Sequence, residues 1–163
     1  MKEFLYDNLK DWEVEIVERY PEIYLDPSPY IESMLEEYYK DQKTVNLRYG
    51  FEFAEGWKGL VEEYSMGVME ILKRVKEETE FDPESYYIKG CVMKEKFGKL
   101  TIQNDYDLPT LFAEEYRDFT NSVEEKSIKI CEKCGEPANP AGVGVGFCGW
   151  IRCLCANCRK NIK

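Results

Sequence analysis

The sequence predicts an α+β fold: a small antiparallel sheet packed by helices, followed by a C-terminal zinc ribbon. Three observations lead to this prediction. Apolar residues recur with a period near 3.6 between positions 57 and 75, which indicates a helix. The segments 86–93 and 100–103 are typical of two strands joined by a hairpin turn. Two Cys-x2-Cys pairs, separated by twenty residues, lie near the end of the chain and have the spacing of a zinc site.

The N-terminal part of the chain is predicted to hold two helices and a strand. The apolar periodicity over 4–19 indicates a helix, which Pro21 ends. A turn and cap cluster at 26–29 opens a second helix that extends to about Tyr39. Apolar and polar residues then alternate over 44–53, as in a half-buried strand. This strand brings the expected antiparallel sheet to about three strands.

The middle of the chain completes the predicted body. The long helix begins at Trp57. The two hairpin strands are joined around residues 94–99, where Gly98 supplies the positive φ that a tight turn needs. A last helix, predicted over 108–128, leads the chain to the first cysteine pair. We therefore divide the chain into a body, residues 1–129, and a zinc ribbon docked on it, residues 130–163.

The four paired cysteines are the strongest chemical signal in the sequence. The predicted metal ligands are Cys131, Cys134, Cys155 and Cys158. Four thiolates close a tetrahedral zinc site and leave no position for a substrate, so we expect structural zinc, with an iron–sulfur site as a less favoured alternative. Gly135 is placed to let the first knuckle turn, so that backbone N–H groups point at sulfur. The Gly-, Pro- and Ala-rich segment 135–149 is expected to be a loop.

Three further cysteines lie outside the two pairs. Cys148 and Cys153 could substitute as ligands, but neither forms a Cys-x2-Cys pair, so spare or buried thiols are the simpler interpretation. Cys91 lies in a predicted strand and is interpreted as a small core residue. The number of cysteines, seven, is odd, and six of them lie between positions 131 and 158, which favours a reducing compartment; no signal or membrane-spanning segment is visible. We therefore expect a cytoplasmic protein.

Charge and composition limit the classes of function. The chain has a net charge of −10, whereas residues 130–163 carry five basic and two acidic side chains. Coulomb repulsion disfavours binding of the acidic body to nucleic acid, but it allows a basic partner. Nucleic-acid binding through the ribbon stays open as an alternative. Its basic residues are Lys133, Arg152, Arg159, Lys160 and Lys163.

The chain contains no histidine, which removes the commonest forms of catalysis. Ser-His and Cys-His dyads and histidine-bearing catalytic zinc sites are excluded. The glycine-rich stretch 142–146 lies inside the zinc loop rather than between a strand and a helix, so it is not interpreted as a phosphate cradle. We assign no catalytic residue and regard the protein as more typical of a binding protein than of an enzyme.

Several stretches, taken together and in order, resemble a family of small proteins encoded in phages and prophages whose function is not established. The stretches are Tyr20–Tyr24, Gly50–Trp57, Val92–Leu100, Glu125–Ser127, Cys131–Pro137 and Gly149–Cys155. The Lys-Glu-Lys-Phe-Gly element and the later Cys-Glu-x-Cys-Gly are the most specific of them. The family usually ends in Leu-Cys-x-x-His. Here the corresponding residues end in Cys158, which keeps four ligands while replacing a histidine.

The resemblance implies a phage accessory protein that acts in the cytoplasm of a host cell. From this and the acidic body, we expect it to bind a host or phage protein and to interfere with a host defence factor. Trp57, Phe97 and Trp150 are candidate interaction residues, with core packing as the alternative for each tryptophan and packing onto the sheet for Phe97. Sequestration or turnover of a small nucleotide signal, with aromatic side chains as stacking surfaces, is a further alternative.

Overall fold

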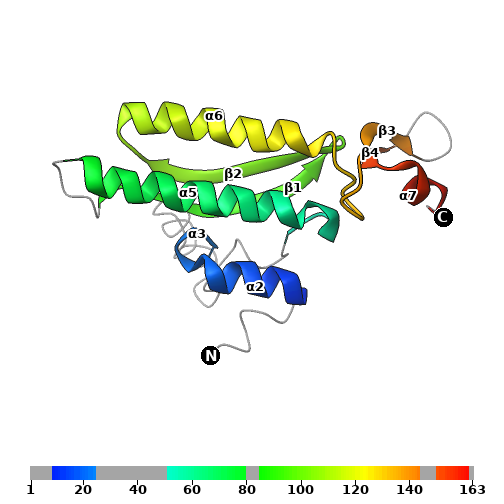
Figure 1. The fold of residues 1–163 in the computed structure, drawn as a ribbon, viewed down its shortest axis with the longest axis horizontal. Helices are drawn as coiled ribbons and strands as arrows, with labels where there is room; N and C mark the ends of the chain where they lie inside the picture. The colour runs from blue at the N-terminus through cyan, green and yellow to red at the C-terminus, as the bar shows by residue number, and fades with distance from the viewer. Residues whose placement is uncertain (1–8, 25–50, 80–84, 144–149, 162–163) are drawn as a thin grey trace, which may run out of the picture.

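The computed structural model of this protein describes residues 9–24, 51–79, 85–143 and 150–161. The helix expected at 26–39 and most of the strand expected at 44–53 lie outside these residues. Within the described part the fold is α+β, as predicted (Figure 1).

Two long helices and a β-hairpin form the centre of the body. Helix α5 (Lys58–Glu78) and helix α6 (Thr110–Ser127) run alongside the hairpin of β1 (Tyr87–Lys96) and β2 (Lys99–Asp107), as Figure 1 shows. The apolar positions of α5 recur every three or four residues, so one stripe of that helix is buried against the sheet and α6. The strands extend beyond the predicted ones, and α6 begins two residues later than expected.

The β-hairpin is closed by a two-residue turn. Lys96 pairs with Lys99, and the two residues between them, Phe97 and Gly98, have φ values of 54° and 79°. Positive φ at both central positions is the mark of a type I′ turn, whose twist matches that of the strands. The register shifts between Lys89 and Val92, where Gly90, with a φ of 65°, lies in a bulge.

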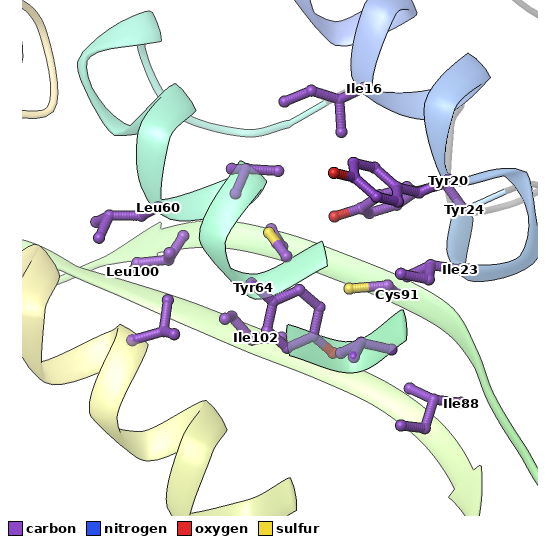
Figure 2. Close-up of a cluster of buried hydrophobic side chains, with 14 of the residues drawn as sticks. Ile16, Tyr20, Ile23, Tyr24, Leu60, Tyr64, Ile88, Cys91, Leu100 and Ile102 are labelled. Carbon is purple, nitrogen blue, oxygen red and sulfur yellow. The ribbon is translucent and has the colours of Figure 1, made fainter. Parts of the chain in front are cut away.

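The N-terminal segment covers one edge of the hairpin. Helix α2 (Asp11–Arg19) is followed by the short helix α3 (Pro21–Tyr24), which packs on β1. Figure 2 shows side chains from both helices meeting those of α5 and the strands in the core. Residues 51–53 lie beside β1 through a parallel bridge between Glu52 and Lys94. The described end of the expected third strand is therefore an isolated parallel bridge, not an antiparallel strand.

The C-terminal segment forms a ribbon at one end of the body (Figure 1). Strands β3 (Asn139–Val143) and β4 (Trp150–Leu154) pair antiparallel, and helix α7 (Ala156–Lys160) follows. Part of the segment expected to be a loop, 135–149, is therefore strand β3. No helix in the described ranges is both long and apolar enough to cross a membrane.

Candidate metal centre

The first cysteine pair lies in a tight turn directly after α6. Gly135 has a φ of 80° and donates its N–H to the carbonyl oxygen of Cys131 at 2.8 Å. The N–H of Cys131 in turn bonds to the carbonyl oxygen of Glu136 at 2.7 Å. A residue with a Cβ is strained at such a φ, so glycine is the residue that closes the knuckle. This part of the prediction is confirmed.

The second pair is formed by the start of α7. Cys155 is the N-cap of that helix, and its sulfur accepts the N–H of Cys158 at 3.4 Å. Because a helix N-terminus carries unpaired N–H groups, a thiolate is well placed there. The short helix thus fixes the positions of both sulfurs.

The structure brings the four predicted cysteines together. Their sulfur atoms all lie within 4.8 Å of one another. The sulfur of Cys134 lies 3.6 Å from that of Cys155 and 3.5 Å from that of Cys158. Metal–sulfur bonds of about 2.3 Å place the corners of a tetrahedron about 3.8 Å apart. The donor set and its spacing therefore fit one tetrahedral metal ion.

The protonation of the cluster also fits a cation. Burial raises the pKa of Cys131, but the backbone N–H groups of Cys155, Cys134 and Lys133 donate to its sulfur, and the net effect lowers the pKa to about 6. The neighbouring sulfur of Cys134, followed by burial, raises the pKa of Cys158 to about 12. A divalent cation would stabilise all four as thiolates.

The remaining cysteines do not join the cluster in the described residues. Cys153 is fully buried and packs in the main hydrophobic core, and Cys148 lies outside the described residues. Cys91 is 2% exposed, and burial raises the pKa of its thiol to about 12. This placement matches the interpretation of Cys91 as a core residue.

The ribbon packs closely against the start of α5. The N–H of Gly56 bonds to the carbonyl oxygen of Glu132 at 2.8 Å. A Cβ at Gly56 would lie 2.2 Å from the carbonyl oxygen of Cys131. Next along the chain, the indole Nε1 of Trp57 donates to the carbonyl oxygen of Ile130 at 2.8 Å. Backbone and side chain both join the body to the first knuckle.

The hairpin turn makes a second contact with the ribbon. A Cβ at Gly98 would lie 2.9 Å from the Cβ of Pro140 and 3.2 Å from the Cγ2 of Ile151. The turn of β1–β2 therefore lies directly on β3 and β4. Ser127 adds a contact inside the body, because its Oγ accepts the N–H of Leu100 at 2.8 Å.

An ion pair with one buried partner joins the first knuckle to β4. Glu132 is fully buried, and its carboxylate pairs with the guanidinium of Arg152 on β4. The N–H of Glu132 also bonds to the carbonyl oxygen of Cys153 at 2.9 Å. Sequence reasoning missed this residue, because a glutamate between two cysteines is indistinguishable from a solvated one by pattern alone. The sequence marks Gly56 only as part of one of the stretches that resemble the phage-encoded family, and not as a contact residue.

The three candidate interaction residues have different environments. Trp57 is fully buried, so its ring is core and is not presented as an interface anchor. Phe97 is 79% exposed and does not pack onto the sheet. Trp150 begins β4, and its side chain lies outside what the structure describes.

The basic residues predicted as a nucleic-acid patch are partly engaged within the protein. Arg152 pairs with Glu132, and Arg159 donates to the carbonyl oxygens of Leu154 and Asn139. Lys133 and Lys160 are exposed, and Lys163 lies outside the described residues.

Comparisons with protein-family models, curated proteins and solved structures found no match.

Proposed function

We propose that this is a non-catalytic protein in which a structural zinc ion fixes the ribbon to the body and an exposed hairpin turn binds a partner protein. The closed set of four cysteines supports the structural role, since a tetrahedral site with four protein ligands leaves no open coordination position. Gly56, Trp57 and Gly98 belong to the body and contact the ribbon directly, so a ribbon that is ordered by the ion is held against the body. In this proposal, zinc holds the ribbon in place behind the turn.

The observation that carries the binding role is the conformation of Phe97. It occupies the first central position of a type I′ turn, where Asn, Asp and Gly are preferred, with a φ of 54°. A left-handed conformation costs a residue with a Cβ about 1–2 kcal/mol. Burial does not offset that cost, because the side chain is 79% exposed. Stability therefore does not account for an aromatic residue at this position, whereas a contact with a partner does.

The surroundings of Phe97 indicate the chemistry of the partner. Ile151, 42% exposed, lies against the same turn, and Lys96 next to Phe97 is exposed. An apolar pair flanked by a cation matches a partner surface that presents an apolar pocket with acidic groups at its rim. We propose a host or phage protein, with a host defence factor as the candidate target. The resemblance to phage-encoded proteins supports this choice. A contact through the acidic surface of the body stays a prediction.

The test compares two exposed apolar residues at opposite ends of the body. Phe97→Asn suits the type I′ turn and leaves the core intact, so the variant should fold at least as stably as the wild type. Leu111→Asn removes a side chain at the start of α6 that is also 79% exposed. Tagged, zinc-loaded proteins are used to capture partners from nuclease-treated bacterial lysate, and captured proteins are identified by mass spectrometry.

We expect the wild type and Leu111→Asn to retain the same partner and Phe97→Asn to lose it. Retention of that partner by Phe97→Asn would contradict the assignment of the turn as the binding surface. Absence of any protein partner with all three proteins would contradict the binding role itself.

Nucleic-acid binding at the same end of the molecule is a second candidate. An exposed aromatic ring beside Lys96, with Lys133 and Lys160 exposed on the ribbon, is favourable for stacking on bases and for phosphate contacts. A labelled single-stranded oligonucleotide should then bind with an affinity that falls steeply as salt is raised. Lack of binding at low salt removes this candidate.

A further inference from the structure

The outer edge of β2 is paired with side chains of α6 over part of its length. The N–H of Leu100 donates to the Oγ of Ser127 at 2.8 Å, and the N–H of Ile102 donates to the Oε1 of Glu124 at 2.8 Å. These N–H groups point away from β1. The helix thus supplies two of the acceptors that a neighbouring strand would otherwise provide.

Beyond Ile102, no residue that the structure describes supplies such an acceptor to the same edge. Gln103 pairs with Val92 and Asp105 pairs with Lys89, so the backbone groups of Asn104 alternate to the outer side. The backbone groups of Tyr106, two residues further along the strand, point to the same side. Among the described residues, no side chain accepts a hydrogen bond from the N–H of Asn104 or Tyr106. An edge of this kind can pair with another extended chain.

A groove of about 480 Å³ lies at this open edge, between β2 and α6. Its volume falls in the range of about 300–1,000 Å³ that is usual for ligand sites. Its lining includes Asn104 and Tyr106 on the strand, and Tyr116, Arg117, Asn121 and Glu124 on the helix. The groove therefore has a strand edge on one side and a helix on the other.

The wall of the groove is held firmly in place. Tyr116 is 2% exposed, and its hydroxyl lies 2.7 Å from that of Tyr64 in the core. The Nδ2 of Asn104 contacts both hydroxyls. Tyr106 packs edge-on against Tyr116, with 5.0 Å between ring centroids. A ligand would meet a strand whose side chains are already ordered, which lowers the entropic cost of binding.

We propose that this groove binds a short extended peptide segment, which adds to β2 as a further strand beside Asn104 and Tyr106. Strand addition between a sheet edge and a helix is an established way of recognising peptides, with main-chain bonds giving affinity and alternate side chains giving specificity. Here one set of the peptide's side chains faces Tyr106 and Tyr116, so apolar residues suit those positions.

The charges around the strand indicate which residue types suit the peptide's other set of side chains, those that point away from Tyr106 and Tyr116. Arg117 and Glu124 line the groove with opposite charges, whereas Asp105 and Asp107 lie on β2 in the other phase of the strand, the phase that the second set of peptide side chains shares. The chain as a whole carries a net charge of −10. A segment that alternates basic and apolar residues is therefore the complementary ligand. The groove lies at the opposite end of β2 from Phe97, and the inference does not rest on the proposed role of that turn.

The test uses the full, zinc-loaded protein and a defined probe. The probe is an acetylated and amidated pentapeptide of alternating lysine and valine, Lys-Val-Lys-Val-Lys. Binding is followed by the backbone amide signals of ¹⁵N-labelled protein. We expect the signals of Asn104 and Tyr106 to shift with the peptide, while that of Phe97 stays unchanged. Shifts that spread over the surface without involving Asn104 and Tyr106 would overturn the proposal, as would the absence of any shift.

Two variants on the same turn of α6 separate groove binding from general attraction to an acidic protein. Asn121→Trp fills the groove, whereas Ser122→Trp places the same side chain on an exposed neighbouring position that does not line it. We expect Asn121→Trp to weaken binding at least about tenfold and Ser122→Trp to leave it nearly unchanged. Equal effects of the two variants would count against the groove.

Modified probes test the main-chain bonds and the charge. A probe N-methylated at alternate residues loses the donors that pair with the strand, so it should bind about tenfold or more weakly. The Glu-Val-Glu-Val-Glu peptide should bind more weakly than the lysine peptide, with a difference that shrinks as salt is raised. Equal binding of the methylated and unmodified probes would exclude strand addition. Equal binding of the acidic and basic probes would exclude the assignment of a basic ligand.

Discussion

The indole nitrogen of Trp57 donates a 2.8 Å hydrogen bond to the carbonyl oxygen of Ile130, the residue that immediately precedes the first cysteine of the cluster. The two residues are 73 positions apart in the chain. One is the residue from which α5 starts, and the other ends the segment that leaves α6. The bond therefore ties both long helices to the knuckle.

Replacing Trp57 by Phe should destabilise the protein by more than the smaller ring alone would. The variant leaves the Ile130 carbonyl without its donor, which costs about 1–3 kcal/mol when the acceptor is buried. Trp12→Phe is the matched control, because Trp12 is also buried and no described residue accepts a bond from its indole nitrogen. Urea unfolding of both variants measures the difference. Equal losses of stability would show that the bond contributes little.

Gly56→Ala and Gly59→Ala should have opposite effects. At Gly56 an added methyl group meets the backbone of Cys131, Glu132 and Gly135 within 2.6 Å, so the ribbon must shift, at a cost of about 1–3 kcal/mol. At Gly59, in the first turn of α5, nothing lies within 4 Å, and alanine should add about 0.5–1 kcal/mol by restricting the unfolded chain. Thermal unfolding at saturating zinc measures both. A neutral Gly56→Ala would contradict the tight junction.

Metal analysis should give about one zinc per chain for the wild type. Cys134→Ser removes one of the four sulfurs, so we expect the variant to lose zinc to a chelator that the wild type resists. Cys153→Ala is the control: it should keep its zinc while losing roughly 1 kcal/mol or more of stability, because that side chain is buried in the main core. Loss of zinc by Cys153→Ala would show that the ligand set has been misassigned.

Stability should fall on the alkaline side between about pH 9 and pH 12. Burial raises the pKa of Cys91 and of Tyr116 to about 12, and it raises those of Tyr24 and Tyr64 well above the ordinary value. A group whose pKa is raised in the folded state contributes its full stabilisation below the pKa that it has in the unfolded state, about 8.5 for cysteine and 10 for tyrosine. This contribution is lost as the pH rises through the folded values, since the unfolded state releases protons first.

The alkaline transition can be followed by circular dichroism together with tyrosinate absorbance. We expect the part of the absorbance change that comes from Tyr24, Tyr64 and Tyr116 to coincide with the change in circular dichroism, because these buried phenols ionise on unfolding. Tyr64→Phe removes one of these groups, so unfolding should release about one proton fewer. The free energy of unfolding should then fall less steeply with pH. Tyrosine ionisation that is complete near pH 10 with the fold intact would contradict the buried network.

Local patterns were sufficient for the parts of the fold that depend on near neighbours in the chain. The 3.6-residue period located α5, the alternation around Gly98 located the hairpin, and the cysteine spacing located the cluster. In each case the determining residues lie within a few turns or a few strand positions of one another. Gly135 belongs to the same class, because its conformation is set by the turn that contains it.

Contacts between distant segments could not be predicted in this way. The fit of Gly56 against Cys131 and the pairing of Glu132 with Arg152 depend on how the ribbon is placed on the body, which no local pattern encodes. Strand β3 lies in the segment 135–149, which is predicted to be a loop because its Gly- and Pro-rich composition has low strand propensity. Tertiary packing overrides that preference.

The four sulfurs of the cluster differ in their access to solvent, since Cys131 is sealed whereas Cys134 is exposed. A bound metal ion would therefore be reached by an incoming thiol or chelator from the Cys134 side, where that ligand would be the first to be displaced. The opening of a single knuckle would then set the rate at which such an ion leaves the cluster. Slow equilibrium release and rapid ligand-assisted exchange are compatible in such a centre.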